Sequence, residues 1–127
     1  MTGKWPELVK AGVTVGLGVD STNSSNFCDI IREMYLAALL PRDARVDPSA
    51  MDAEKAIEMA TIDGARAIGW DAEIGSLEAG KKADVILLDT RRIEWRPLYS
   101  VVNALVYSAT GDSVDPLACE RRRHRRD

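Results

Sequence analysis

The sequence feature that most constrains the fold is the short apolar run V-T-V-G-L-G-V at residues 13–19, which Asp20 follows directly. The run is rich in β-branched residues and lacks a strict alternation of apolar and polar positions. This pattern is typical of a strand that is covered on both faces in a parallel sheet. Six small polar residues at 21–26 come next. The sequence therefore predicts a buried strand that ends in a polar loop.

Helical patterns flank the predicted strand. Residues 6–11 are predicted to be the end of a helix that Gly12 closes. Apolar residues at helical spacing predict a longer helix over 27–40, which Pro41 is expected to end. Asp52 and Thr61 are predicted to cap two shorter helices. Helix, strand, loop and helix in this order indicate an α/β fold.

The sequence changes in character near residue 70, where we predict a boundary. Residues 1–70 are expected to be α/β, and residues 71–118 mostly β. The strand candidates of the second part are residues 83–88 and a strand within residues 101–107, both rich in β-branched side chains. Residues 119–127 form an arginine-rich tail.

The distribution of charge excludes some partners. Up to residue 118 the chain has 12 basic and 18 acidic residues, and five of its 17 basic residues fall within the last seven positions. Phosphate contacts need clustered cations, so this acidic body is not expected to bind nucleic acid. No apolar run is long enough to span a membrane, and the first residues do not resemble a signal peptide. We therefore predict a cytoplasmic protein without a membrane partner.

Asp20 is the strongest candidate for chemistry. A carboxylate at the end of a buried parallel strand lies where α/β folds bind their ligands, and it can serve as a general base or a metal ligand. The alternative, an aspartate that caps its own loop, has about equal weight from position alone. Ser24, Ser25 and Asn26 in the following loop are weaker candidates, because such residues are more often caps than ligands.

Three stretches of the sequence resemble a known family. They are G-V-T-V-G-L-G-V-D-S at 12–21, A-I-E-M-A-T-I-D-G-A-R-A-I-G at 56–69 and I-G-S-L-E-A-G-K-K-A-D-V-I-L-L-D at 74–89. In this order and spacing they are similar to the C-terminal part of amidohydrolase-superfamily enzymes. The most similar branch is the cytosine-deaminase-like group, with its S-adenosylhomocysteine deaminases and triazine hydrolases. The similarity runs from about Pro6 to Asp115.

The resemblance implies a (β/α)₈ barrel flanked by a small β-sandwich, of which this chain would hold the last strand, the following helices and part of the sandwich. It also implies hydrolysis of a C–N or similar bond in a purine-, pyrimidine- or triazine-like ring. A divalent zinc or iron ion would activate the water. Asp20 would hold the metal or its bound water and move a proton. Ser24, Ser25 and Asn26 would border the substrate pocket.

The chain departs from the family pattern in its histidines. The family's metal site uses several, whereas this sequence has one, His124, in the arginine-rich tail. A single carboxylate cannot make a catalytic zinc site. We therefore expect a fragment that alone binds no metal and has no deaminase activity. Its uncovered strand edges predict a marginal fold or a homo-oligomer that hides them. The alternative function is a short, non-catalytic α/β binding module with a basic tail.

The tail suggests a shifted reading frame. The family pattern here is a last strand of the form V-x-x-V-x-V-N-G-x-x-V. The residues C-E-R-R-R-H-R-R at 119–126, written in permitted codons and read one nucleotide later, give A-N-G-V-V-I-V. We therefore hypothesise a frameshift between about Asp115 and Cys119, which the DNA sequence would test. The functional alternative is an arginine-rich anchor for nucleic acid or an acidic partner.

Overall fold

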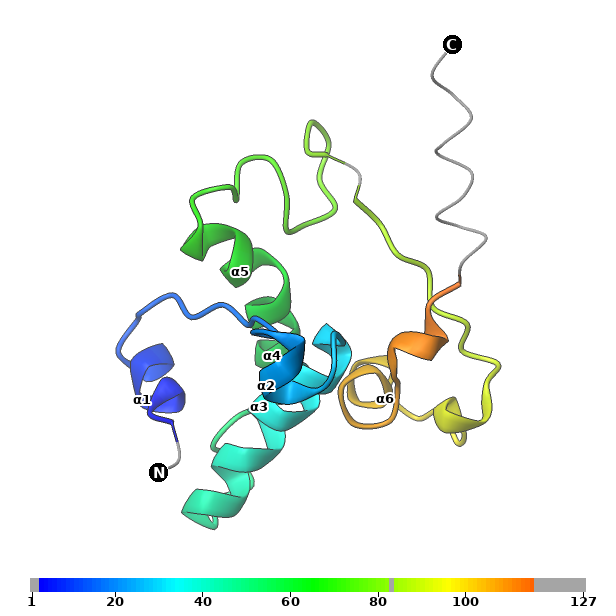
Figure 1. Cartoon of the computed structure of the whole chain (residues 1–127), viewed down its shortest axis with the longest axis horizontal. Coiled ribbons are helices and arrows are strands. Elements are labelled where there is room, and N and C mark those ends of the chain that lie inside the picture. Colours follow the sequence, from blue (N-terminus) through cyan, green and yellow to red (C-terminus); the bar gives the residue numbers. More distant parts are fainter. Residues whose placement is uncertain (1–2, 83, 116–127) are drawn as a thin grey trace.

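The computed structural model describes residues 3–82 and 84–115 of the chain, and these residues are mainly helical (Figure 1). The elements in these ranges are α1 (Trp5–Lys10), α2 (Thr22–Ser25), α3 (Ile30–Arg45), α4 (Ala53–Ala60), α5 (Ile62–Ala67), α6 (Val101–Tyr107) and the 3₁₀ turns η1 (Ile93–Trp95) and η2 (Gly111–Ser113). The helices predicted after Asp52 and Thr61 are confirmed as α4 and α5. The predicted Thr61 cap is wrong, because the Thr61 hydroxyl donates to Ile57 O at 2.7 Å and its side chain caps no N–H of α5. The Asp52 carboxylate caps α4 by accepting a hydrogen bond from Lys55 N at 2.7 Å.

The hydrophobic core lies where α3, α4 and α6 pack together. Its largest fully buried side chain is Trp95, which is 1% exposed. The Trp95 indole Nε1 donates a hydrogen bond to Ser113 Oγ at 3.0 Å, so burial leaves no polar atom of the ring unpaired. Trp95 therefore joins the helical core to the η2 turn.

Pro41 does not end the helix, contrary to the prediction from sequence. Helix α3 continues through Pro41 to Arg45, and Val46 closes it with a left-handed backbone at φ +50°. A proline inside a helix has no N–H for the carbonyl four residues earlier, here that of Ala37. The Trp5 indole Nε1 donates to Ala37 O at 3.4 Å. A side chain of α1 thus supplies the hydrogen bond that Pro41 cannot.

The strand predicted within residues 101–107 is wrong, because these residues form α6. The Ser100 side chain caps the helix by accepting a hydrogen bond from Asn103 N at 3.2 Å. Val102, Leu105, Val106 and Ala109 contribute to the hydrophobic core, and their spacing is helical. The capping serine and this periodicity outweigh the β propensity of the valines.

The two other predicted strands form no sheet within residues 3–82 and 84–115. Residues 13–19 form neither a helix nor a paired β-strand, and Val13 is 49% exposed. Residues 84–89 form one isolated antiparallel bridge, Leu88 with Val114. Two backbone hydrogen bonds flank it, from Asp89 N to Ser113 O and from Asp115 N to Leu87 O, both 2.8 Å. Extended segments need neighbouring strands to satisfy their backbone groups, and the described residues supply too few.

Some predictions concern residues that the structure does not describe. The arginine-rich tail at 119–127, with its proposed frameshift and His124, lies outside the described residues. Residue 83, the first of the strand predicted at 83–88, also lies outside the described residues. Among the described residues, no helix is long and apolar enough to cross a lipid bilayer.

Candidate functional site

Asp20 lies at the end of the extended segment, where the chain turns away from the helices. Its backbone has φ +60°, a left-handed conformation that is uncommon outside glycine and often marks functional sites. Asp20 is exposed, and its Oδ1 accepts a hydrogen bond from Ser21 N at 2.8 Å. This bond is local and joins two neighbouring residues of the loop. The hydrogen bonds described include none from a described residue to Oδ2.

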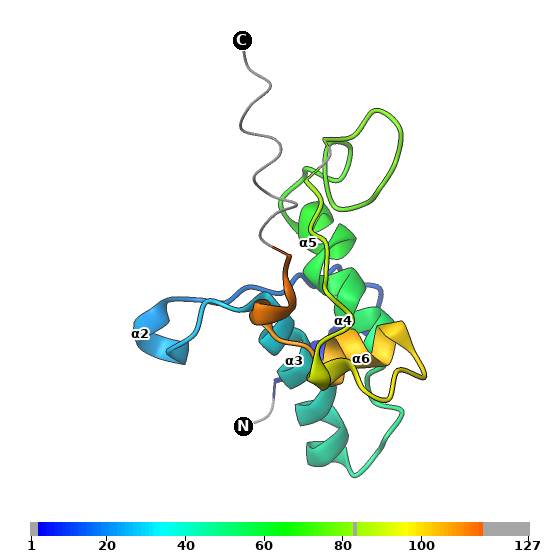
Figure 2. The same cartoon turned by 90° about the vertical axis from the view of Figure 1, so that its right-hand side faces the viewer.

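The polar loop after Asp20 forms the short helix α2, which stands away from the helical core (Figure 2). Ser24 N donates to Ser21 O at 2.9 Å, and the Ser21 hydroxyl donates to Asn23 Oδ1. Ser24 and Asn26 are exposed, and Asn26 ends α2 with φ +61°. Ser25 is the last residue of α2. The three predicted pocket residues thus share one turn, but none of the hydrogen bonds described joins Ser24 or Asn26 to the Asp20 carboxylate.

The far end of this loop is fixed by Asp29, which sequence reasoning missed. Asp29 Oδ1 accepts from Ile31 N at 2.9 Å and caps α3. Its Oδ2 accepts from Gly111 N at 2.9 Å, so one carboxylate ties the loop to a residue 82 positions away. An aspartate directly before the apolar pair Ile30 and Ile31 is a recognisable helix-start signal and could have identified the cap.

The donor set of this region does not form a metal centre by itself. No group of three or more His, Cys, Asp or Glu side chains is placed to hold a metal ion in the part of the chain that the structure describes. Catalytic zinc takes about three protein ligands. Asp20 is therefore not joined by enough candidate ligands among the described residues to hold a zinc ion.

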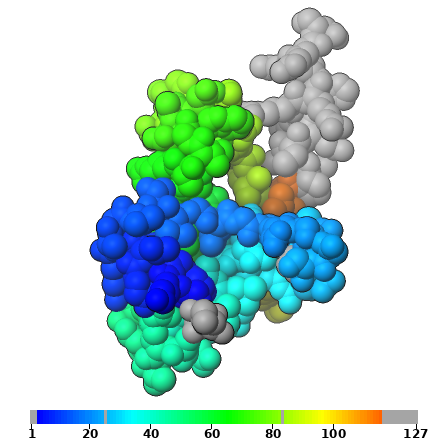
Figure 3. All heavy atoms as spheres, turned by 60° about the vertical axis from the view of Figure 1, so that its left-hand side comes forward, coloured from blue at the N-terminus to red at the C-terminus, as the bar shows by residue number. Residues whose placement is uncertain are grey.

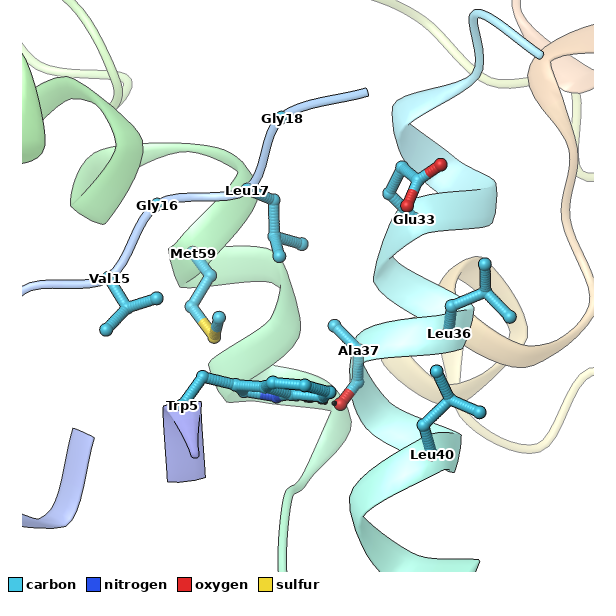
Figure 4. A pocket seen from close by; sticks show the side chains of 10 residues that line it. All are labelled: Trp5, Val15, Gly16, Leu17, Gly18, Glu33, Leu36, Ala37, Leu40 and Met59. Carbon is cyan, nitrogen blue, oxygen red and sulfur yellow. Dashed lines mark hydrogen bonds between the residues drawn. The ribbon is translucent and has the colours of Figure 1, made fainter. Parts of the chain in front are cut away.

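An apolar groove, also missed from sequence, lies between residues 15–18 and α3. Its volume is about 340 Å³, and Glu33 is the one charged side chain among the described residues that line it. The side chains of Val15, Leu17 and Met59 and the Trp5 ring turn toward one another (Figure 4). Figure 3 shows α1, in dark blue, on the face turned to the viewer and next to the cyan atoms of α3. No local motif could reveal this groove, because its walls come from four separate segments.

The chain belongs to the amidohydrolase family, because the model of that family matches residues 2–119. It is 46% identical over 110 residues to an S-triazine hydrolase of Gordonia rubripertincta, a match that covers 87% of this chain and 23% of the relative. It is 47% identical over 109 residues to a 5-methylthioadenosine/S-adenosylhomocysteine deaminase of Moorella thermoacetica. That match covers 86% of this chain and 26% of the relative. The family and the branch inferred from sequence are confirmed.

Solved structures agree with this assignment. An adenosine deaminase from Xanthomonas campestris with bound zinc matches with a TM-score of 0.84 and 36% identity, over 87% of this chain and 25% of that one. An atrazine chlorohydrolase from Arthrobacter aurescens, complexed with zinc, matches with a TM-score of 0.78 and 27% identity. This match also covers 87% of this chain and 25% of that one. The chain thus spans about a quarter of the length of the relatives that it matches.

Proposed function

We propose that this chain forms the Asp20-bearing part of an amidohydrolase that acts on a C–N or similar bond of a small nitrogen heterocycle. The observation that carries the proposal is the family match over residues 2–119. The names of the relatives, S-triazine hydrolase and methylthioadenosine/S-adenosylhomocysteine deaminase, support this substrate class. The family match favours this function over a non-catalytic binding module. The proposed location is the cytoplasm.

The proposed fold follows the same assignment. Residues 13–19 would be the last strand of a (β/α)₈ barrel, and residues 71–118 would contribute to a flanking β-sandwich. Residues 1–70 would hold that strand and the C-terminal helices of the barrel. The loop with Ser24, Ser25 and Asn26 would then border the substrate pocket, since it follows the strand directly.

Asp20 is the proposed catalytic residue. Zinc in the solved relatives supports a divalent metal in the complete family enzyme, where it would lower the pKa of a bound water. Asp20 would contribute one carboxylate ligand or hold the attacking water and accept its proton. The isolated chain is proposed to bind no catalytic metal and to release no ammonia, because Asp20 alone cannot complete the site.

A chimera tests this function. The matched residues of this chain would replace the 109 matched residues of the Moorella thermoacetica deaminase, and ammonia release from 5-methylthioadenosine would be measured. We expect Asp20→Asn to lower kcat by about 10²-fold or more, as for the loss of a general acid–base group. The matched control is Asp71→Asn, an exposed aspartate outside the loop. A folded but inactive chimera, or full activity of Asp20→Asn, would contradict the proposal.

A further inference from the structure

Residues 21–28 link Asp20 to α3, and we call them the Asp20 loop. The backbone hydrogen bonds described within the loop join near neighbours, such as Asn26 N to Thr22 O at 2.8 Å. The helix α2 in this loop stands away from the helical core (Figure 2). Local bonds fix the shape of a loop but not its place on the molecule. The place of the Asp20 loop therefore depends on how its two ends are attached.

The second end of the Asp20 loop is attached through Asp29, whose two carboxylate oxygens have different partners. Oδ1 accepts hydrogen bonds from Ile31 N at 2.9 Å and from Arg32 N at 3.4 Å, and these bonds cap α3. Oδ2 accepts from Gly111 N at 2.9 Å. A helix cap needs only one of the two oxygens, so capping alone does not require the bond to Gly111. We call this second bond the Asp29–Gly111 tie.

The turn η2, which contains Gly111, gives the tie a fixed point. It packs against α3, and Figure 1 shows the orange turn beside the cyan helix. Ser113 of η2 is 0% exposed, and its hydroxyl accepts from the Trp95 indole and donates to Glu94 Oε1, both at 3.0 Å. The Ser113 carbonyl accepts from Asp89 N at 2.8 Å. The tie therefore attaches the Asp20 loop to a turn that is anchored in the hydrophobic core.

We propose that Asp29 is a positioning residue for substrate binding, because the Asp29–Gly111 tie holds the Asp20 loop in its place. This inference rests on the proposed function, in which the loop borders the substrate pocket. Asp29 bonds to backbone N–H groups of α3 and η2, so its loss removes no group from the chemical step. Without the tie, substrate must order the loop whenever it binds, which costs part of the binding free energy. Such a loss raises KM and leaves kcat unchanged.

Two substitutions break the tie from opposite sides. Asp29→Ser keeps a good capping side chain at the start of α3 but removes the oxygen that accepts from Gly111 N. Gly111→Pro removes the N–H donor and leaves the aspartate in place. Proline fits at the first residue of a helical turn, and Thr110 before it is already extended, at φ −135° and ψ 171°. Gly111→Ala keeps the N–H, and its Cβ would lie 3.4 Å from Asp29 Cγ, an ordinary contact.

Steady-state kinetics of the chimera with 5-methylthioadenosine measure the effect on substrate binding. We expect Asp29→Ser and Gly111→Pro each to raise KM by about tenfold and to change kcat by less than about twofold. The double variant should have the KM of either single variant, because both substitutions remove the same interaction. Gly111→Ala should raise KM far less than Gly111→Pro. The matched control is Asp52→Ser, the same substitution at the cap of α4, which should leave KM unchanged.

Amide hydrogen exchange of the full chain, followed by NMR, tests the tie without any activity. The Gly111 amide should exchange about tenfold faster in Asp29→Ser than in the wild type, because it loses its acceptor. The Ser113 amide, which donates to Thr110 O at 2.9 Å, should change far less. Far-UV circular dichroism should report equal helicity in Asp29→Ser and Asp52→Ser. Unchanged exchange at Gly111 would overturn the proposal.

The kinetic outcomes separate a positioning role from a purely structural one. If Asp29→Ser and Asp52→Ser raise KM equally, Asp29 acts only as a helix cap and the proposal is overturned. Additive effects of Asp29→Ser and Gly111→Pro would overturn it as well. An inactive chimera with the unaltered matched residues would contradict the proposed function and this inference with it. An active chimera whose KM is unchanged in both tie variants would overturn this inference alone.

Discussion

The helical core and the extended segments of this chain differ in how well they bury their apolar side chains. Ala38 of α3 and Ala56 of α4 are both 0% exposed, whereas Val85, Ile86 and Leu87 in the extended stretch are 43%, 56% and 55% exposed. All five residues are apolar. A helix satisfies its backbone within itself and needs only side chains to pack on. An extended segment also needs the backbone of a neighbour, so it depends far more on the presence of its partners.

The largest effect is expected in the helical core. Trp95→Ala removes its largest buried side chain and the hydrogen bond to Ser113. We expect the free energy of unfolding to fall by about 3–5 kcal/mol, as for other buried aromatic truncations. Urea titration followed by circular dichroism measures this change. A loss below about 1 kcal/mol would mean that the helices do not share one core.

A smaller effect is expected where the extended segment meets the helices. Gly16→Ala would bring a Cβ atom within 2.9 Å of Gly64 Cα, a contact that forces backbone to move. We expect a loss of about 1–3 kcal/mol in the same titration.

The neighbouring glycine provides the control for this substitution. Nothing lies within 4 Å of a Cβ atom at Gly18, so Gly18→Ala should stay within about 1 kcal/mol of the wild type. Equal stability of the Gly16→Ala and Gly18→Ala variants would show that the segment does not rest on α5.

The smallest effect concerns the buried carboxylate that joins α4 to α5. Lys55 Nζ donates to Asp63 Oδ2 at 2.6 Å and holds the pKa of Asp63 below its ordinary value of 3.8. Burial opposes this shift, and Arg66 adds to it. Because the pKa is lower in the folded state, this stabilisation is present above about pH 3.8 and is lost as the pH falls through the folded-state value.

Thermal melting of the wild type and of Asp63→Asn, from about pH 5 to pH 2, measures this contribution. The wild type should have the higher Tm at pH 5, and the difference should shrink as the solution becomes more acidic. A difference that stays constant over this range would show that the ionised carboxylate adds nothing to the contact between α4 and α5.

Sequence reasoning was most successful where local signals decide the structure. Asp52 identified the start of α4 because its side chain caps that helix. Thr61 marked the start of α5 by position alone, since its hydroxyl bonds to Ile57 O instead of capping the helix. Sequence reasoning failed for residues 101–107, where it relied on the β propensity of the valines and missed the Ser100 cap. It also failed at Pro41, because the donor that replaces the missing N–H is Trp5, more than thirty residues away.

The candidate site likewise has one part that local sequence signals predicted and another part that depends on distant residues. The position of Asp20 at the end of an apolar run was visible in the sequence, and the structure adds its left-handed backbone. The tie between Asp29 and Gly111 and the groove beside α3 bring distant residues together, so no local pattern contains them. The catalytic role of Asp20 stays a prediction until the chimera is measured.

The hydrogen bond from Trp5 to Ala37 has a consequence for how related sequences vary. Position 41 determines whether the carbonyl of residue 37 lacks its helical donor, and position 5 supplies the substitute. The two positions should therefore change together. Where a relative has a residue with a backbone N–H at position 41, α3 completes its own hydrogen bonding, and tryptophan at position 5 is no longer required for that purpose.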